Sequence, residues 1–299
     1  MKSLGWKIPY TRPEYPAELE QAGCGPLLSA VLALRGIRTE QDAKELLDGG
    51  LTCLHDPMQM QGMAPAVERI RRAIERKEAV AVYGDYDVDG ITATCLVTDY
   101  LRSKGLTCVG YIPDRNEEGY GLNCAALDSL YAEGVRLLIT VDCGITAVFE
   151  AEHTLELGMD MIVTDHHECK PGALPRAIAV IDCKQPGNRY PNPDLAGVGV
   201  ALKLVCAVEG DDESMLIRYA DLVAVGTVAD VMPLVGETAI WSAAGWTCCQ
   251  NLPVPVLPPC CGRPGWITPA SPRATSASTW PLASTPPGVW GRPPRRPTC

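Results

Sequence analysis

The stretch GDYDVDG, residues 84–90, decides both the fold and the chemistry expected of this chain. The apolar, β-branched run AVAVYG at residues 79–84 leads into it and ends in glycine, which is typical of a buried strand. The run ITATCLVTDYLRSKG at residues 91–105 follows it and reads as a helix that ends at a glycine. The turn between the strand and the helix therefore carries three aspartates, Asp85, Asp87 and Asp89.

The alternation of strands and helices continues beyond this turn. Further strands are expected at residues 107–112, 136–142, 160–167 and 177–182, with helices at 123–134 and 146–158 between them. Alternating elements of these lengths predict an α/β fold, in which a parallel sheet carries helices on both faces. Such sheets bind ligands beyond the carboxyl ends of their strands.

Acidic and imidazole side chains gather at those predicted strand ends. Besides the first three aspartates they are Asp142, Asp165, His166, His167 and, further on, Asp230. Carboxylates that converge on one rim repel one another strongly unless cations neutralise them. Carboxylates with imidazoles suit Mn²⁺, and carboxylates with water suit Mg²⁺. Two such ions side by side would form the arrangement used for attack on phosphate esters.

Each motif also has a simpler structural interpretation. The three aspartates could cap the following helix and otherwise be solvated, and the histidine pair could be a surface or core pair. A calcium loop needs a glutamate at its twelfth position, which is Leu96 here, and it follows a helix. Arg115 could be a surface charge or a bidentate phosphate anchor. Gly197 and Gly199 lack the rest of a dinucleotide fingerprint, which favours close helix packing.

Residues 1–75 are expected to form a small helical lead. Thr39 is placed to cap the helix that follows it, with Asp42 in the first turn of that helix. A further helix is expected at residues 64–77, where apolar side chains recur at helical spacing. We expect packing to be the role of this part of the chain.

The composition changes near residue 240. Residues 239–299 contain no Asp, Glu or Lys, and they hold 13 of the 26 prolines and five of the six tryptophans. No helical or strand period is visible, so a disordered tail is expected over residues 241–299. A Pro-rich linker is one interpretation. The cysteine pairs at residues 248–249 and 260–261 lack the usual spacing of a zinc site.

A change of reading frame explains this tail better. If GC-rich codons are moved by one base, residues 278–292 can be back-translated to read FHLAPRLNAAGRMG, an ordinary amphipathic segment. Residues 241–249 and 254–266 can be rewritten in the same way. We therefore expect the native frame to be lost at about residue 240 or 241.

Composition also limits the function classes. The apolar runs are far shorter than the ~18 residues of a membrane span, and the start of the chain lacks the apolar stretch of a signal peptide. The 14 cysteines show no disulfide framework and mostly lie in apolar runs, which predicts a reduced, cytoplasmic protein. The net charge of −10 argues against a broadly basic nucleic-acid-binding surface, but it allows a local groove or a metal site that takes phosphates.

The motifs together resemble the DHH phosphoesterase superfamily, which is named for a triplet such as Asp165-His166-His167. Within it they resemble the RecJ family of single-strand-specific 5′→3′ DNA exonucleases. The matching motifs are GDYDVDGITAT, PDR-x₃-GYGL, ITVDCGI, VTDHHE, LAGVGVALKL and DLVAVGTVADVMPL, in the family's order over roughly residues 25–238. The resemblance implies a metal-dependent phosphodiesterase that acts on single-stranded DNA in repair and recombination. The rewritten segment LAPRLNAAGRMG also resembles the family's sequence just downstream.

The resemblance implies a role for each matching residue. The ligands of two Mn²⁺ or Mg²⁺ ions would be Asp87, Asp89, Asp142, His166 and Asp230, with Asp142 shared between the ions. The remaining catalytic residues would be Asp85 and Asp165, which orient the ligands, and His167, which is a ligand or faces the scissile phosphate. The phosphates of the strand would be held by Arg115, Gly119, Tyr120 and Gly121. Tyr83 stands where many DHH phosphoesterases have a histidine, so the ligand set of one ion departs from theirs.

The resemblance further implies a division of the chain into a lead at residues 1–75, a catalytic domain at 76–240 and the tail at 241–299. The family carries a second domain and an OB-fold region beyond the catalytic domain, and the printed tail matches neither, so weakened activity is expected. The implied partners are single-stranded DNA and a single-strand-binding protein or helicase, with no membrane.

Two alternatives remain open. One is a DHH enzyme for small substrates, such as an oligoribonucleotide, a cyclic dinucleotide or pyrophosphate. The other is a non-catalytic DHH binding protein of a replication complex. The retained candidate ligands argue against the second alternative.

Overall fold

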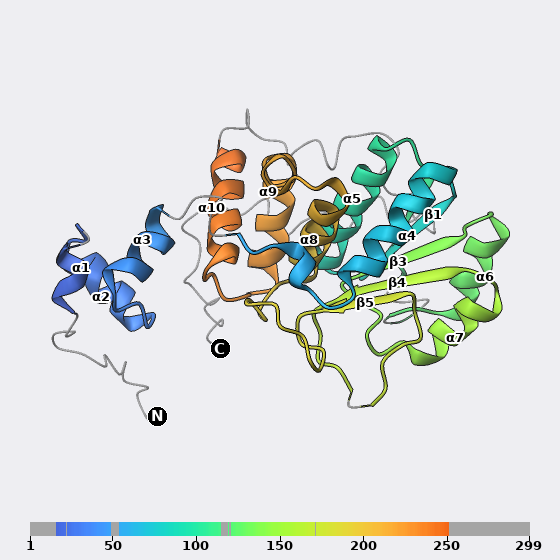
Figure 1. The fold of residues 1–299 in the computed structure, drawn as a ribbon, viewed down its shortest axis with the longest axis horizontal. Helices are drawn as coiled ribbons and strands as arrows, with labels where there is room; N and C mark the ends of the chain where they lie inside the picture. The colour runs from blue at the N-terminus through green and yellow to red at the C-terminus, as the bar shows by residue number, and fades with distance from the viewer. Residues whose placement is uncertain are drawn as a thin grey trace, which may run out of the picture.

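The computed structural model describes residues 16–21, 23–48, 54–114, 119, 121–170 and 172–250. In this part of the chain, five parallel strands form one sheet in the order β2-β1-β3-β4-β5 (Figure 1). The strands are β1 (Val80–Gly84), β2 (Cys108–Tyr111), β3 (Leu137–Val141), β4 (Asp160–Asp165) and β5 (Ala179–Asp182). The predicted parallel α/β sheet is confirmed, with each of the five expected strands present.

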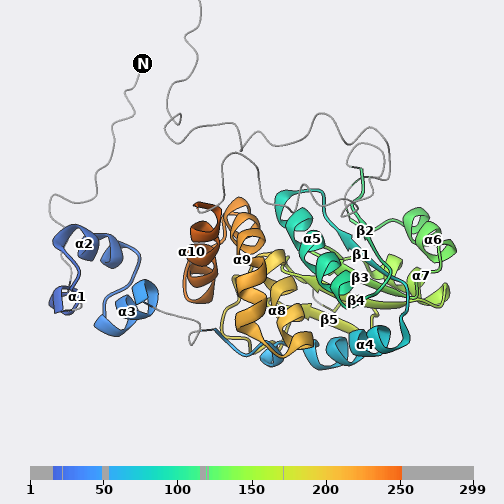
Figure 2. The same ribbon diagram turned by 90° about the horizontal axis from the view of Figure 1, so that it is seen from above.

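Helices cover both faces of the sheet, as predicted (Figures 1 and 2). One face carries α4 (Met63–Arg76), α5 (Val88–Ser103) and α8 (Gly197–Glu209), and the other carries α6 (Cys124–Ala132) and α7 (Val148–Glu156). Helix α9 (Asp212–Ala229) packs on α5 and α8. Alternate strand residues serve the two cores, Val80 and Val82 on one side and Ala81 and Tyr83 on the other. This burial on both faces explains why the strands read as continuous apolar runs.

The first three helices have a small core of their own. They are α1 (Ala17–Gln21), α2 (Pro26–Leu34) and α3 (Glu40–Asp48), and they enclose Leu19 and Leu32. The predicted cap is confirmed, because Thr39 Oγ1 accepts a hydrogen bond from the amide of Asp42 at 3.1 Å. After a 3₁₀ turn, η2 (Pro57–Gln59), helix α4 buries its apolar side chains in the main core. Helix α4 therefore packs with the sheet, although the predicted division placed it with the lead.

Helix α10 (Glu237–Gln250) runs across the predicted boundary at residue 240 and packs on α9. Trp241 is fully buried, and a Cβ at Gly245 would lie 2.1 Å from the carbonyl oxygen of Ala220. The expectation that regular structure ends at residue 240 is therefore wrong for residues 241–250. The buried side chain of Trp241 and the close contact at Gly245 contribute to this interface. Neither of them repeats at helical spacing, so the apolar pattern of the sequence does not reveal the helix. Residues 251–299 lie outside the described residues.

A buried ion pair joins α8 to α10. Lys203 Nζ lies 2.7 Å from Glu237 Oε2, and the two side chains are 2% and 0% exposed. Lys203 also donates to the carbonyl oxygen of His55 at 2.8 Å, and the Tyr190 hydroxyl donates to Glu237 at 2.6 Å. The sequence analysis did not single out any of these residues. The network holds α8, the helix whose first turn reaches the candidate site.

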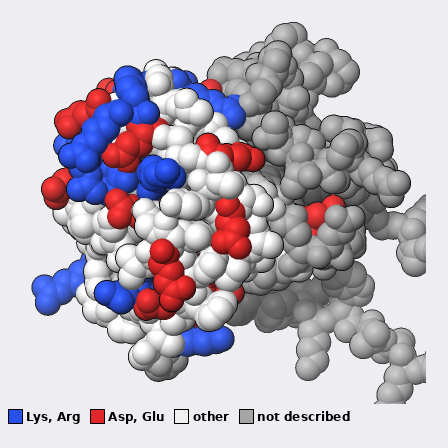
Figure 3. All heavy atoms as spheres, turned by 90° about the vertical axis from the view of Figure 1, so that its right-hand side faces the viewer, with Lys and Arg blue, Asp and Glu red and all other residues white. Residues whose placement is uncertain are grey.

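Charged side chains and cysteines can be located on the described part of the chain. On the side drawn in Figure 3, Lys and Arg gather at one edge and Asp and Glu are spread over the rest, so this side offers no broad basic face. Nine cysteines in the described ranges are free, and six of them are buried. No helix in the described ranges is long and apolar enough to cross a membrane.

Candidate metal centre

The carboxyl ends of β1, β3 and β4 bring the predicted site residues together. The register pairs Gly84 with Val141 and Val141 with Thr164, so the residues that follow start from neighbouring positions. Their ligand atoms form three groups, each with all atoms within 4.8 Å of one another. The groups are Asp85, Asp87 and Asp142; Asp89, His166 and Asp230; and Asp142, His166 and His167. All eight residues predicted at this rim except Asp165 belong to a group.

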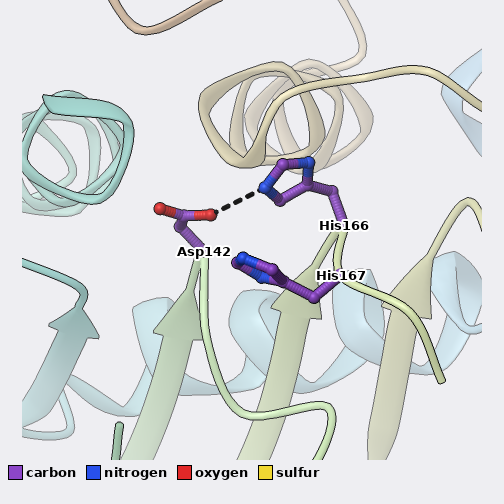
Figure 4. A group of neighbouring side chains, drawn as sticks. All are labelled: Asp142, His166 and His167. Carbon is purple, nitrogen blue, oxygen red and sulfur yellow. Dashed lines mark ion pairs between the residues drawn. The ribbon is translucent and has the colours of Figure 1, made fainter. Parts of the chain in front are cut away.

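The centre of the cluster is an imidazole nitrogen that faces carboxylates. His166 Nε2 lies 3.1 Å from Asp142 Oδ1 (Figure 4). It also lies 3.7 Å from Asp230 Oδ2 and 3.8 Å from Asp89 Oδ2. Asp142 Oδ1 is buried and accepts no hydrogen bond within the described residues. Asp142 Oδ1 and His166 Nε2 thus lie close together without a hydrogen bond between them. Each can donate an electron pair, so a cation could bind both. Asp142 belongs to two of the groups, which is the position of a ligand that two ions share.

Two of the aspartates also hold helix ends. Asp87 caps α5, where it accepts a hydrogen bond from the Gly90 amide at 2.9 Å. Asp89 accepts from the amides of Gly197 at 2.6 Å and Val198 at 2.8 Å, in the first turn of α8. The capping interpretation is therefore correct for Asp87, and it does not exclude metal binding because each carboxylate oxygen has a second lone pair.

Glycines let two helices approach the acidic cluster. A Cβ at Gly197 of α8 would lie 2.5 Å from the Asp142 Cβ. A Cβ at Gly226 of α9 would lie 2.9 Å from Asp89 Oδ1. A Cβ at Gly199 would lie 3.2 Å from the ring of Trp241, so the interpretation of Gly197 and Gly199 as packing residues is confirmed.

Two residues at the cluster have left-handed backbone conformations, Asp142 and Val231, each with φ of 57°. Aspartate tolerates this region, but a β-branched residue does so at a cost of about 1–2 kcal/mol. Val231 follows Asp230, the residue at the end of α9, and its amide bonds back to Val228. Glycine is the usual residue at this position of a helix end. Strain of this kind is concentrated at functional sites.

Asp165 lies behind the cluster and orients the histidine pair. It accepts hydrogen bonds from the amides of Ile145 at 2.9 Å and His166 at 2.7 Å, and its Oδ1 lies 2.7 Å from His167 Nδ1. Burial acts to raise the pKa of Asp165, but the hydrogen bonds from His167 and from backbone amides lower it below its ordinary value. The same contact raises the pKa of His167 to about 9.

Three carboxylates of the cluster, those of Asp142, Asp89 and Asp85, have raised pKa values. Burial, followed by the charges of neighbouring aspartates, raises the pKa of Asp142 to about 10. Burial raises the pKa of Asp89 to about 6, against the effect of its hydrogen bonds to α8. Burial also raises the pKa of Asp85. The cluster of carboxylates at the rim therefore favours the binding of a cation.

Without divalent ions, the melting temperature is expected to fall as the pH rises from about 5 to about 9. The pKa values of Asp89, Asp142 and His167 are all raised by folding, so the folded chain holds protons that the unfolded chain has lost. The lowered pKa of Asp165 acts only in the acidic range near 3.8 and below, outside this window. Thermal melts in EDTA across this range test the expectation, and saturating Mn²⁺ should flatten the slope. A melting temperature that is constant or rises in EDTA would contradict it.

The predicted phosphate-holding turn is described only in part. Arg115 and Tyr120 lie outside the described residues, while Gly119 and Gly121 have φ of 85° and 84°. Tyr83 donates its hydroxyl to the carbonyl oxygen of Gly121 at 3.1 Å. Tyr83 therefore supports this turn and belongs to none of the three ligand groups.

Sequence reasoning missed Asp182 at the end of β5. It is 2% exposed and stands opposite Asp165 in the sheet register. Its Oδ1 accepts from the amide of Lys184 at 2.6 Å, and burial raises its pKa to about 7. The rule that found the other carboxylates, a charged residue at a strand end, would have found this one as well. Asp182 belongs to none of the three ligand groups.

Comparison with known proteins finds a matching family model and several similar proteins. The model "DHH family, N-terminal domain" matches residues 79–227. The single-stranded-DNA-specific exonuclease RecJ of Bacillus subtilis is 43% identical over 226 residues, 76% of this chain and 28% of that protein. RecJ of Escherichia coli is 37% identical over 246 residues, 78% of this chain and 41% of that protein. A crystal structure of RecJ in complex with Mn²⁺ from Thermus thermophilus matches with a TM-score of 0.62 and 30% identity over 77% of this chain and 32% of that one. The chain thus spans less than half the length of these relatives.

Proposed function

The chain belongs to the DHH family, and on this premise we propose that its acidic rim is the two-metal site of a phosphodiesterase, a 5′→3′ exonuclease on single-stranded DNA. The observation that carries the proposal is the position of Asp142, which is buried, shares one ligand group with Asp85 and Asp87, and shares another with His166 and His167. The single-stranded substrate rests on similarity to the RecJ exonucleases. The polarity rests on the resemblance of the sequence motifs alone.

The residues at the rim fit divalent ions. Asp85, Asp87 and Asp142 would hold one ion, and Asp89, His166 and Asp230 would hold the other. Asp142 lies 3.1 Å from His166 and is therefore near enough to serve both ions. Oxygen ligands with one imidazole suit Mn²⁺ or Mg²⁺. When bound, the ions would neutralise phosphate charge and lower the pKa of a water between them. Asp85 thus joins the ligand set in this proposal, where the sequence assigned it an orienting role.

Asp165 and His167 would together hold a proton where it can reach the substrate. Asp165 faces His167 Nδ1, which keeps a proton on that nitrogen and turns Nε2 away from Asp165. In the metal-free chain the contact with Asp165 raises the pKa of His167 to about 9, which favours a proton on Nε2 as well. His167 can then donate from Nε2 to a phosphate oxygen, and Arg115, Gly119, Tyr120 and Gly121 would hold phosphates further along the strand.

The wider setting belongs to the same proposal. A single-strand-binding protein or a helicase is the expected protein partner. A cytoplasmic location fits the nine free thiols in the described ranges. The division of the chain near residue 240 and the change of frame remain predictions, and sequencing the DNA across codons 236–245 tests both.

Oligonucleotides labelled at the 5′ or the 3′ end test the proposed reaction. With Mn²⁺, we expect mononucleotides to be released from the 5′ end of a single strand, no release in EDTA, and resistance of a blunt duplex. Pyrophosphate and dinucleotides in the same assay separate this function from that of a small-substrate DHH enzyme. Degradation from the 3′ end, or faster hydrolysis of pyrophosphate than of the oligonucleotide, would contradict the proposal.

A further inference from the structure

A pocket of about 370 Å³ opens beside His167, on the face of the sheet that carries α6 and α7. The residues that line it include the apolar Leu122, Ile145 and Ala147 and the acidic Glu150 of α7. Asp165 and His167 line the end that adjoins the metal centre. Its volume and mainly apolar walls with few polar groups are those of a small-molecule pocket.

Hydrogen bonds and glycine geometry hold this pocket in shape. Tyr83 donates to the carbonyl oxygen of Gly121, which lies on the pocket wall, and it stacks on Tyr111 with ring centroids 4.9 Å apart. Gly144, also on the wall, has φ of 109°, and a Cβ there would lie 2.6 Å from Thr140 Oγ1. The pocket is therefore built into the fold and does not depend on a ligand to form.

The pocket offers a carboxylate acceptor beside apolar residues. No Lys or Arg is among the described residues that line it, and of its two acidic residues Asp165 is paired with His167, which leaves Glu150 as the acceptor that faces a ligand. A flat, uncharged group with hydrogen-bond donors fits these walls and this acceptor. Nucleobases are such groups, and guanine presents two adjacent N–H donors that match the two oxygens of one carboxylate.

We infer that this pocket takes the base of the nucleotide whose phosphate lies at the metal centre. The inference rests on the proposed function, because it needs a phosphate ester beside His167. Glu150 accepts hydrogen bonds from the base, and the apolar side chains Leu122 and Ile145 contact its ring. The site therefore distinguishes a nucleotide from a sugar phosphate, with a modest preference for guanine.

The test is calorimetric titration of the full chain, with Mn²⁺ present, by deoxyguanosine monophosphate and by deoxyribose 5-phosphate, which lacks a base. We expect the nucleotide to bind about tenfold more tightly than the sugar phosphate, which is about 1.4 kcal/mol. Ala147→Trp fills the pocket and should remove this difference without changing Mn²⁺ binding. Phe149→Trp is the matched control, because the side chain of Phe149 is 73% exposed and is not part of the pocket wall.

A second variant tests the carboxylate without filling the pocket. Glu150→Gln should reduce the preference for deoxyguanosine over thymidine monophosphate and leave the affinity for deoxyribose 5-phosphate unchanged. If wild type binds Mn²⁺ but binds both ligands equally, or if Ala147→Trp binds the nucleotide as wild type does, the pocket assignment is wrong and the metal centre stands. If wild type binds no Mn²⁺, the proposed function fails and the inference fails with it.

Discussion

Asp142→Asn is expected to remove the response to divalent ions and, at the same time, to stabilise the metal-free chain. Asp142 is 1% exposed and stands among other carboxylates, so its charge is costly when no cation is bound. Replacing a buried charge of this kind by a neutral group of similar shape can stabilise a protein by about 1–4 kcal/mol. Asparagine also tolerates the left-handed backbone at this position. Turnover should fall at least about 10³-fold, since metal catalysis supplies several kcal/mol.

Thermal melts at pH 8 with EDTA or Mn²⁺ measure both effects. Wild type should melt at a higher temperature with Mn²⁺, and Asp142→Asn should melt above wild type in EDTA and show no further rise with Mn²⁺. Asp128→Asn is the control, because the side chain of Asp128 is 57% exposed and pairs with His153, outside the ligand groups. A variant that is destabilised in EDTA and still responds to Mn²⁺ would show that Asp142 has a packing role instead.

Lys203→Met is expected to destabilise the chain by about 3–5 kcal/mol, because it leaves the Glu237 carboxylate buried without its cation. For a domain of this size, each kcal/mol lowers the melting temperature by roughly 2–4 °C. The double variant Lys203→Met, Glu237→Gln should recover part of the loss, because no unpaired charge remains. Denaturant titration of the single and double variants measures the free energies of unfolding.

Lys184→Met provides a matched control for this prediction. Lys184 lies 3.7 Å from Glu168, whose side chain is 86% exposed, and pairs of this kind contribute less than about 1 kcal/mol. If Lys203→Met costs no more than Lys184→Met, the buried network does not hold α8 against α10. The metal centre would then depend on other contacts to keep the first turn of α8 against Asp89.

The parts of the fold that follow from local patterns could be predicted from the sequence. Strands buried on both faces give short apolar runs, and the aspartates after Gly84 and Val141 mark the ends of two of them. Because parallel strands end at one edge, these positions predict a convergence that the structure bears out. Asp142 and the histidine pair therefore meet, although 24 residues separate Asp142 from His166.

Contacts between distant segments could not be predicted in this way. The pairing of Lys203 with Glu237 and the hydrogen bond from Tyr83 to Gly121 depend on how helices and loops pack, and no local pattern signals them. Helix α10 was missed for a related reason, since Trp241 inserts into the core from a segment that lacks an apolar period. Asp182 was missed although it follows the same strand-end rule as its neighbours.

The number of Mn²⁺ ions bound per chain directly tests whether the acidic rim is a two-metal site. Electron paramagnetic resonance of free Mn²⁺ during a titration gives that number without reference to activity. We expect two ions for wild type, because Asp142 shares a ligand group with Asp85 and Asp87 and lies 3.1 Å from His166 of the other proposed set. We expect tight binding to be lost in Asp142→Asn. A wild-type chain that binds no Mn²⁺ at millimolar concentration, or an Asp142→Asn variant that binds as wild type does, would contradict it.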